Sequence, residues 1–549
     1  MFADLHCHPS NRSFNRIRNS DEDPLNVKNV FPLLNEDKTI WYEFPEDIAI
    51  KKQQQRAGFR AGMSTYPQCD MASITNADVY LVFAALYPIE KGFVSGSGKV
   101  FSASVVTEIV NMVLTKKGLK WLAKILKPIT SNFDAIVSLL VNNKGPGRDL
   151  LQHWVMRFTT KRVNFLQQDS YHYFEEMQKE RWLYEYGDNQ KPQIDGIRKY
   201  QLIRDSAHLK RVFGSGDIAV VQTLEGMHML SQRSDSKGNP EYVGWNALAQ
   251  NIREVKTWNI FFITFCHHYD NSLAGHARSL PELMQQISNQ EPRRHEGFQK
   301  DPGQLVKDGD GMKAARFLLS LDDNLQDDAT AGPRILIDVK HMAARARKEY
   351  YDEIITLYNT ANPNKKIPVI ASHVGYSGRK TLQELISNAD QETDELFKNS
   401  FYQWNINLSD EDVRMIVESG GIIGLSFDQR IIGVDLATHP QTDSHWAGYL
   451  VNNIVAFVNA CIDSTLSQPY RAWDCIGLGS DFDGFIDPVD PFATSERFGY
   501  CMSEILKLFE AMGEPTKRYL GLLRNPYTPG EVIEKIAYKN AFDFTTRNF

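Results

Sequence analysis

Residues 1–9 read Met-Phe-Ala-Asp-Leu-His-Cys-His-Pro, an apolar start that leads into two histidines two positions apart. The apolar residues predict a short β-strand. Because the side chains of a strand alternate between its two faces, His6 and His8 are expected to point to the same side. Imidazole is the commonest side-chain ligand of metal ions. The stretch therefore predicts a strand whose end contributes two ligands to a divalent metal ion.

Further runs of apolar and β-branched residues follow, and each ends in polar or small residues. Counting the first, the runs are Phe2–Leu5, Val79–Ala84, Ile218–Leu224, Ile260–Phe265, Ile335–Val339, Pro368–Ala371, Gly421–Ser426 and Cys475–Gly479. Segments with helical periodicity lie between most of them, with apolar faces such as Val451, Ile454, Val455, Val458 and Met502, Ile505, Leu506, Phe509, Met512. Eight strands that alternate with helices favour an α/β protein with a TIM-type (β/α)8 barrel over an open sheet.

The spacing between the runs is uneven, and about 130 residues separate the second run from the third. We interpret residues 1–549 as a single barrel domain with a helical insertion at about 90–215. Loop insertions are expected at about 276–311 and 380–405. The alternative is a separate domain that interrupts the barrel. Within the helical insertion the periodicity predicts helices over Val105–Leu126 and Phe133–Val141. Phe158–Lys199, which is rich in aromatic and charged residues, is expected to form a further helix.

The composition excludes several classes of protein. The chain has 61 basic and 68 acidic residues, so its net charge of −7 argues against a nucleic-acid binder with a basic surface. The six cysteines are scattered without a CxxC pair, which is typical of a reducing compartment rather than of a disulfide framework. No apolar run reaches the roughly 20 residues that span a bilayer. We expect a cytoplasmic protein, with no signal peptide in this chain.

Residues with metal-binding or catalytic chemistry gather where the predicted strands end. Glu225 ends the third run and Asp481 follows the eighth. Six of the 14 histidines also lie at such ends, namely His6, His8, His267, His268, His341 and His373. The carboxyl ends of barrel strands meet at one face of the barrel, where active sites lie. We therefore expect these residues to form one site.

Two divalent ions, with zinc as the expected metal, need about three protein ligands each. His6 and His8 are expected to hold one ion. His341 and His373 are expected to hold the other, with Glu225 as the carboxylate between them. Such ions lower the pKa of a water molecule and polarise a carbonyl group.

Five ordered motifs support the same site: Glu225-Gly226-x-His228, Thr264-x-x-His267-x-x-x-Asn271, Leu336-Ile337-Asp338-x-x-His341, Pro368-Val369-Ile370-x-Ser372-His373 and Gly477-x-Gly479-x-Asp481-Phe482-Asp483-Gly484. With the tail Tyr527–Asn540, this set resembles the membrane dipeptidase family, which comprises renal dipeptidase and its bacterial relatives within the amidohydrolase superfamily. The resemblance covers both ends of the chain and most predicted strands, but not the insertions. It implies a hydrolase that cleaves an amide bond in a small substrate, with a dipeptide as the first expectation.

The resemblance also implies roles for individual residues. Glu225 is expected to bridge two metal ions, with His341 and His373 completing the second site. Asp481 is expected to act as the general acid and base. His267 is expected to bind the carbonyl oxygen of the substrate, where a hydrogen-bond donor is most effective as negative charge develops.

The chain departs from the family pattern at two positions. His8 stands where the family usually has Asp, although the wider superfamily uses His-x-His. Ile406 stands where the family has an Arg that grips the terminal carboxylate of the substrate, and an isoleucine cannot pair with a carboxylate. Arg379, Lys380 and Arg430 from nearby loops are the candidates to replace that Arg.

Other residues near the motifs have simpler explanations. Strand alternation is expected to turn Lys340 away from the face of His341, which argues against a lysine-based metal bridge. His268 is expected to be a loop residue that supports the site. Asp338 and Asp483 are expected to orient ligand imidazoles or to cap loops.

Two alternative functions remain open. A phosphoesterase of the polymerase-and-histidinol-phosphatase type also begins with Asp-Leu-His-x-His, and it would use three metal ions and a phosphate substrate. A barrel that has lost catalysis and serves as a binding module is the alternative outside the enzymes. We expect a small-molecule substrate, no nucleic-acid partner, and a homodimer as the assembly to test.

Overall fold

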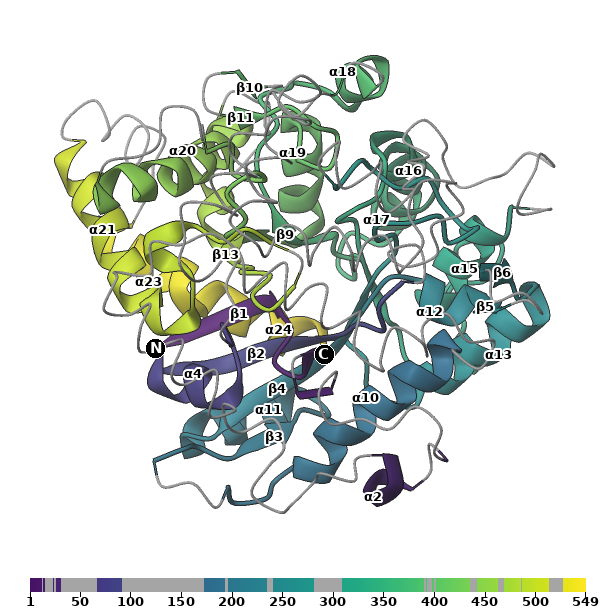
Figure 1. Cartoon of the computed structure of the whole chain (residues 1–549). Coiled ribbons are helices and arrows are strands. Elements are labelled where there is room, and N and C mark those ends of the chain that lie inside the picture. Colours follow the sequence, from purple (N-terminus) through teal and green to yellow (C-terminus); the bar gives the residue numbers. More distant parts are fainter. Residues whose placement is uncertain are drawn as a thin grey trace, which may run out of the picture.

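Eight parallel strands pair side by side in a closed ring at the centre of the protein (Figure 1). They are β1 (Phe2–Cys7), β2 (Val79–Leu86), β4 (Ile218–Glu225), β7 (Phe262–Thr264), β8 (Leu336–Asp338), β9 (Ile370–Val374), β12 (Ile422–Leu425) and β13 (Ile476–Leu478). Their order around the ring is β1-β2-β4-β7-β8-β9-β12-β13, and β13 returns to β1. The expected (β/α)8 barrel is therefore confirmed, and each predicted run overlaps one of its strands.

The computed structural model describes residues 1–11, 13–14, 23, 26–30, 67–90, 172–192, 196–234, 240–280, 309–389, 392, 397–398, 401–434, 442–462, 469–484, 486–512 and 527–549. The helices expected over 105–126 and 133–141 lie outside these residues, as does much of the loop insertion at 276–311. The division of the chain into one barrel domain and three insertions therefore stays a prediction.

The N-terminal strand closes the barrel. Strand β1 lies between β2 and β13, with Asp4 opposite both Val82 and Leu478 (Figure 1). Every residue of β4 is buried, which is the pattern of a parallel strand covered on both faces.

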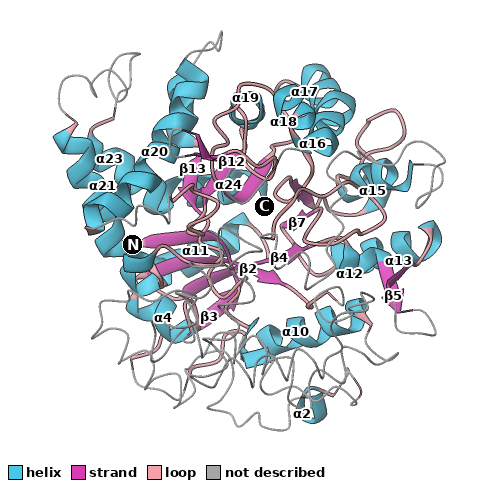
Figure 2. Ribbon diagram, turned by 45° about the horizontal axis from the view of Figure 1, so that its top comes forward, coloured by secondary structure: helices cyan, strands magenta, loops and turns pink. Residues whose placement is uncertain are grey.

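Helices follow each barrel strand and surround the ring (Figure 2). In chain order they are α4 (Met71–Asn76), α11 (Ser206–Ser215), α13 (Trp245–Lys256), α15 (Asp310–Leu318), α16 (Ala344–Tyr350) continued by α17 (Thr356–Ala361), α19 (Asp410–Ser419), α20 (Asp443–Ile462) and α21 (Phe498–Ala511). Helix α19 illustrates why they form where they do. Ser409 and Asp412 make a capping box at its start, Val413 and Ile416 face the core, and Gly420 ends it in a left-handed conformation.

The apolar faces predicted for α20 and α21 are buried as expected. Val451, Ile454 and Val458 of α20 are buried, and so are Ile505 and Phe509 of α21. Two further helices, α23 (Pro529–Glu534) and α24 (Asn540–Asn548), end the chain. The side chain of Asn540 donates hydrogen bonds to the carbonyl oxygens of Trp473 and Ile476, at 2.7 and 2.8 Å, which ties α24 to the last barrel strand.

The described part of the helical insertion contains α10 (Tyr173–Gly187), the short strand β3 (Tyr200–Leu202) and α11. The helix expected to run to Lys199 is wrong at its C-terminal end, because α10 stops at Gly187 and Asn189 adopts a positive φ of 57°. Strand β3 then pairs in parallel with the first residues of β4, from Ile218 to Val220.

The remaining elements are short. They are α2 (Val27–Val30), α12 (His228–Ser231), α18 (Leu382–Ser387) and the hairpins β5 (Gln232–Ser234) with β6 (Pro240–Tyr242) and β10 (Phe397–Lys398) with β11 (Phe401–Tyr402). Among the helices that the structure describes, none is long and apolar enough to cross a membrane.

Candidate metal centre

Glu225 lies at the centre of a ring of imidazoles at the carboxyl ends of the barrel strands. It ends β4 and is almost fully buried. Five histidines place an Nε2 atom near its carboxylate: His6 at 3.1 Å, His8 at 3.2 Å, His267 at 3.5 Å, His373 at 3.7 Å and His341 at 3.8 Å. The structure thus brings together every metal ligand expected from the sequence.

The backbone next to Glu225 depends on a glycine. Gly226 has a φ of 106°, a conformation that side-chain-bearing residues rarely adopt. A Cβ atom there would lie 2.3 Å from Nδ1 of His228. The Glu-Gly-x-His motif therefore allows the chain to turn sharply after Glu225 while His228 packs against the turn.

Asp481 faces the same cluster from the loop after β13. Its carboxylate lies 3.4 Å from His8 Nε2 and 3.8 Å from His373 Nε2. Main-chain hydrogen bonds fix this approach, because Asp481 N–H donates to the carbonyl of His6 at 2.8 Å and His8 N–H donates to the carbonyl of Phe482 at 2.9 Å. The closure of the barrel by β1 therefore sets the position of Asp481.

The turn that carries Asp481 is strained. Asp481 and Asp483 both have a φ of 60°, and backbone strain of this kind is concentrated at functional sites. Gly484 completes the turn, and a Cβ atom at this position would lie 2.1 Å from Oδ1 of Asp481. The absence of a side chain at Gly484 leaves the Asp481 carboxylate free to face the histidines.

The cluster has the composition and the electrostatics of a cation site. Burial disfavours charge on Glu225, but the charges of His267, His6 and His8 hold its pKa well below the usual range, so it is ionised. Burial also opposes charge on His8, yet Glu225 and Asp481 raise the pKa of His8 to about 10. Carboxylates that so strongly stabilise a proton on a neighbouring imidazole also stabilise a metal cation. The cation displaces that proton when it binds.

The donor atoms fall into two groups. One ligand atom from each of His6, Glu225, His373 and Asp481 lies within 4.8 Å of the others. The second group is His267, His268 and His341. Within the described residues, the buried Nε2 atoms of His6 and His8 have no hydrogen-bond partner. Imidazole nitrogens that are buried, turned toward a carboxylate and not hydrogen-bonded fit a divalent metal.

Asp338 and Ser372 orient two of these imidazoles. The Ser372 hydroxyl donates to Asp338 Oδ2 at 2.6 Å, so its oxygen accepts from Nδ1 of His373 at 2.8 Å. His6 Nδ1 lies 3.5 Å from the same oxygen. A proton on Nδ1 leaves the Nε2 lone pair of His373 directed at Glu225. The expectation that Asp338 orients a ligand is met through Ser372, whereas Asp483 caps a loop by accepting from the backbone N–H groups of Gln68 and Cys69, at 2.8 and 3.0 Å.

Glu90 is a functional candidate that the sequence motifs did not reveal. It lies just after β2, and its Oε2 atom is 2.8 Å from Nδ1 of His267. It also accepts from Tyr87 Oη and Tyr269 N–H, both at 3.1 Å. Burial alone would raise its pKa, but the charges of His267 and His228 lower it to about 2. Glu90 therefore fixes the ring of His267 so that Nε2 faces the carboxylate of Glu225. The signal available in the sequence was an acid close to the end of a predicted strand.

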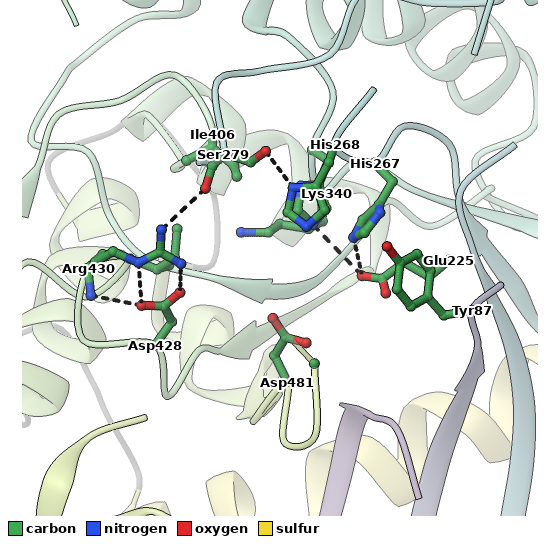
Figure 3. A pocket seen from close by; sticks show the side chains of 13 residues that line it. Tyr87, Glu225, His267, His268, Ser279, Lys340, Ile406, Asp428, Arg430 and Asp481 are labelled. Carbon is green, nitrogen blue, oxygen red and sulfur yellow. Dashed lines mark hydrogen bonds and ion pairs between the residues drawn. The ribbon is translucent and has the colours of Figure 1, made fainter. Parts of the chain in front are cut away.

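A cavity opens beside Glu225 (Figure 3). Its lining consists of Tyr87, Glu225, His267, His268, Ser279, Lys340, His341, Ile406, Asp428, Arg430, Ile431, Asp481 and Gly484. Of the cations expected to replace an Arg at position 406, Arg430 lines this cavity. Arg379 does not line it and donates to the side chain of Gln403 at 2.9 Å, and Lys380 is exposed and pairs with Asp410.

Lys340 differs from its expected orientation. It lines the same cavity as His341 instead of turning away from it. The reason is local: β8 ends at Asp338, and His341 has a positive φ of 65°, so strand alternation no longer applies. Burial lowers the pKa of Lys340 to about 8, against the opposing effect of Asp481 and Asp428.

His228 and His268, two further histidines of the motifs, contact neighbouring protein groups. His228 lies 3.2 Å from the carbonyl of Pro88, and His268 Nδ1 lies 2.6 Å from Ser279 Oγ at the cavity wall. The six cysteines are buried and form no disulfide.

No family model matches the chain, and no curated protein sequence is significantly similar to it. Solved structures with a related fold include a metallopeptidase from Rhodobacter sphaeroides bound to a phosphinate mimic of the dipeptide L-Ala-D-Ala, with 11% identity and a TM-score of 0.42 over 91% of this chain and 96% of that one. The probable dipeptidase PvdM from Pseudomonas aeruginosa has 13% identity and a TM-score of 0.40 over 92% and 98% of the two chains.

A third structure, the metallopeptidase dipeptidase AC, has 13% identity and a TM-score of 0.36 over 64% of this chain and 71% of its own. Similarities at this level carry no argument about function. The strand pairing establishes the fold, and the side chains at the barrel mouth bear on the chemistry.

Proposed function

We propose that this chain is a metal-dependent hydrolase of the membrane dipeptidase type, which uses two divalent ions to cleave an amide bond in a small substrate such as a dipeptide. One observation carries the proposal. The buried carboxylate of Glu225 has imidazoles near both of its oxygens, with Oε2 toward His8 and Oε1 toward His6, His341 and His373. A carboxylate in that position is suited to contact two cations at once.

The ligand types favour zinc, since imidazole and carboxylate groups are its usual nitrogen and oxygen ligands. His8 approaches Oε2 of Glu225, and His6, His341 and His373 approach Oε1. Asp481 faces His8 and His373. Bound divalent ions would polarise the substrate carbonyl and lower the pKa of a water molecule toward neutrality.

The protein groups supply the proton transfers and the charge stabilisation. Asp481 is the least buried of the acids in the cluster, with 15% of its side chain exposed, and it lines the cavity. It can accept a proton from the attacking water and deliver it to the leaving amine. His267, held by Glu90 through Nδ1, presents Nε2 to the carbonyl oxygen, where negative charge develops.

A comparison of two variants tests the proposal. In Asp481→Asn protein loaded with zinc, we expect turnover of dipeptides to fall by at least a hundredfold while most of the metal is retained. In Glu225→Gln protein, metal and activity should be lost together. Asp352→Asn removes an exposed acid far from the cavity and serves as the control. Wild-type turnover by Asp481→Asn protein would refute the proton-transfer role.

The same assay separates the alternatives. Hydrolysis of p-nitrophenyl phosphate without hydrolysis of any amide would favour the phosphoesterase, and tight zinc binding without turnover of either would favour the binding module. The six buried cysteines form no disulfide, which supports a reducing, cytoplasmic location. A homodimeric assembly stays a prediction.

A further inference from the structure

Lys340 is a buried cation for which the described residues supply no ion-pair partner. Only 2% of the residue is exposed. Its side chain lines the cavity and points into the space between the Arg430–Asp428 pair and the Glu225–His267 pair (Figure 3). In the part of the chain that the structure describes, its amino group makes no ion pair and no side-chain hydrogen bond. Buried charges are normally paired, because an unpaired one is costly.

The neighbouring acids are already engaged. Asp428 is held by Arg430, with Nη2 to Oδ2 at 2.6 Å and Nε to Oδ1 at 3.2 Å. Asp481 faces the histidines. Arg430 thus already neutralises Asp428, and Asp481 is turned toward the imidazoles. Lys340 is therefore the cation at this end of the cavity that can pair with an anionic group on whatever fills it.

The remaining surroundings define where that group would lie. Ile406 and Ile431 form an apolar wall of the cavity beside Arg430 and belong to a small buried cluster with Tyr402 and Trp404. An apolar wall excludes water, so an ion pair formed next to it is stronger than one at the surface. The metal-facing side of the cavity lies beyond Lys340, at Glu225 (Figure 3).

We propose that Lys340 binds a carboxylate of the substrate, with Arg430, held in place by Asp428, as the second donor. This inference rests on the proposed function, since it names the part of an amide substrate that the cavity recognises. The resemblance places a carboxylate-binding Arg at position 406, where this chain has an isoleucine. Lys340, next to His341, would bind the carboxylate instead. The substrate class is then a dipeptide or acylated amino acid with a free carboxylate.

Matched substrates test the assignment. The probes are L-Ala-L-Ala and L-Ala-D-Ala, each compared with its C-terminal amide, using zinc-loaded protein. The wild type should prefer the free acids. Lys340→Met should lower kcat/KM for the acids by about 10- to 100-fold, the range for a charge-assisted hydrogen bond, and leave the amides within about twofold. Lys340→Arg should retain most of the preference for the acids.

Two controls make the outcomes distinct. Lys348→Met removes an exposed lysine from α16 and should change neither substrate class. Zinc content and thermal unfolding of Lys340→Met protein show whether it folds. If it does not fold, the inference is tested by whether the wild type and Lys340→Arg protein both prefer the free acids over the amides. Equal losses on acids and amides in a folded, zinc-loaded Lys340→Met protein would overturn the inference, as would a wild type without preference. A wild type that cleaves no amide substrate at all would instead overturn the proposed function.

Discussion

Replacing Ser372 with alanine should weaken metal binding without abolishing catalysis by the metal-loaded protein. The hydroxyl of Ser372 is the acceptor for Nδ1–H of His373, at 2.8 Å. When His373 binds a metal through Nε2, its proton must be on Nδ1, and in the variant this buried N–H has no acceptor. In the metal-free protein the ring can instead carry its proton on Nε2, which faces Glu225 at 3.7 Å.

The cost therefore falls mainly on the metal-bound state. An unsatisfied buried donor costs about 1–3 kcal/mol, which corresponds to a zinc Kd about 5- to 150-fold higher. This range agrees with the 10- to 100-fold typical of residues that orient metal ligands. His6, whose Nδ1 lies 3.5 Å from the same hydroxyl, should add a smaller contribution.

Competition between the protein and a chelator of known zinc affinity measures this Kd. Ser419→Ala is the matched control, because the Ser419 hydroxyl is also buried and makes two hydrogen bonds, to the carbonyl of Ile416 and from the N–H of Val369, away from the metal centre. At saturating zinc, kcat of Ser372→Ala protein should stay within a few fold of the wild type. A zinc Kd within twofold of the wild-type value, in a folded variant, would refute the orienting role of Ser372.

Two other predictions follow from the buried acids around the site. Glu90→Gln keeps the hydrogen bond to His267 but removes its charge, so kcat should fall about tenfold at unchanged zinc content, whereas an unchanged kcat would contradict the role of Glu90. Burial raises the pKa of Glu180, on α10, from 4.5 to about 7, so its neutral form stabilises the fold at low pH and that contribution is lost as the pH rises through 7. Glu180→Gln should remove this pH dependence. In urea unfolding of metal-free protein, the free energy of unfolding of the variant relative to the wild type should rise by about 3 kcal/mol between pH 4 and pH 8. A constant difference would show that Glu180 does not titrate in this range.

The barrel could be predicted because its strands are buried on both faces. Such strands appear in the sequence as continuous apolar runs, as in β4, where all residues are buried. The ligands could be predicted for the same reason: Glu225 and His373 lie at or just before the points where apolar runs give way to polar residues. Their positions along the chain already implied a shared face.

The residues that escaped prediction depend on contacts rather than on periodicity. Lys340 enters the cavity because His341 adopts a positive φ, which no alternation rule contains. Glu90 acts on His267 across a sequence separation of 177 positions, and nothing near Glu90 in the sequence signals that partner. The end of α10 at Gly187 was also missed, since aromatic and charged residues continue beyond it without an apolar period.

The closure of the barrel by its first strand has a consequence for biosynthesis. The ribosome releases His6 and His8 about 470 residues before Asp481 and β13 emerge. At about 5–20 residues per second, this delay is roughly 25 to 95 seconds. During that time one edge of β1 has no strand to pair with and the metal centre lacks a wall. The candidate metal centre is therefore complete only after β13 has been synthesised, and a nascent chain stalled before β13 is a natural target for chaperones.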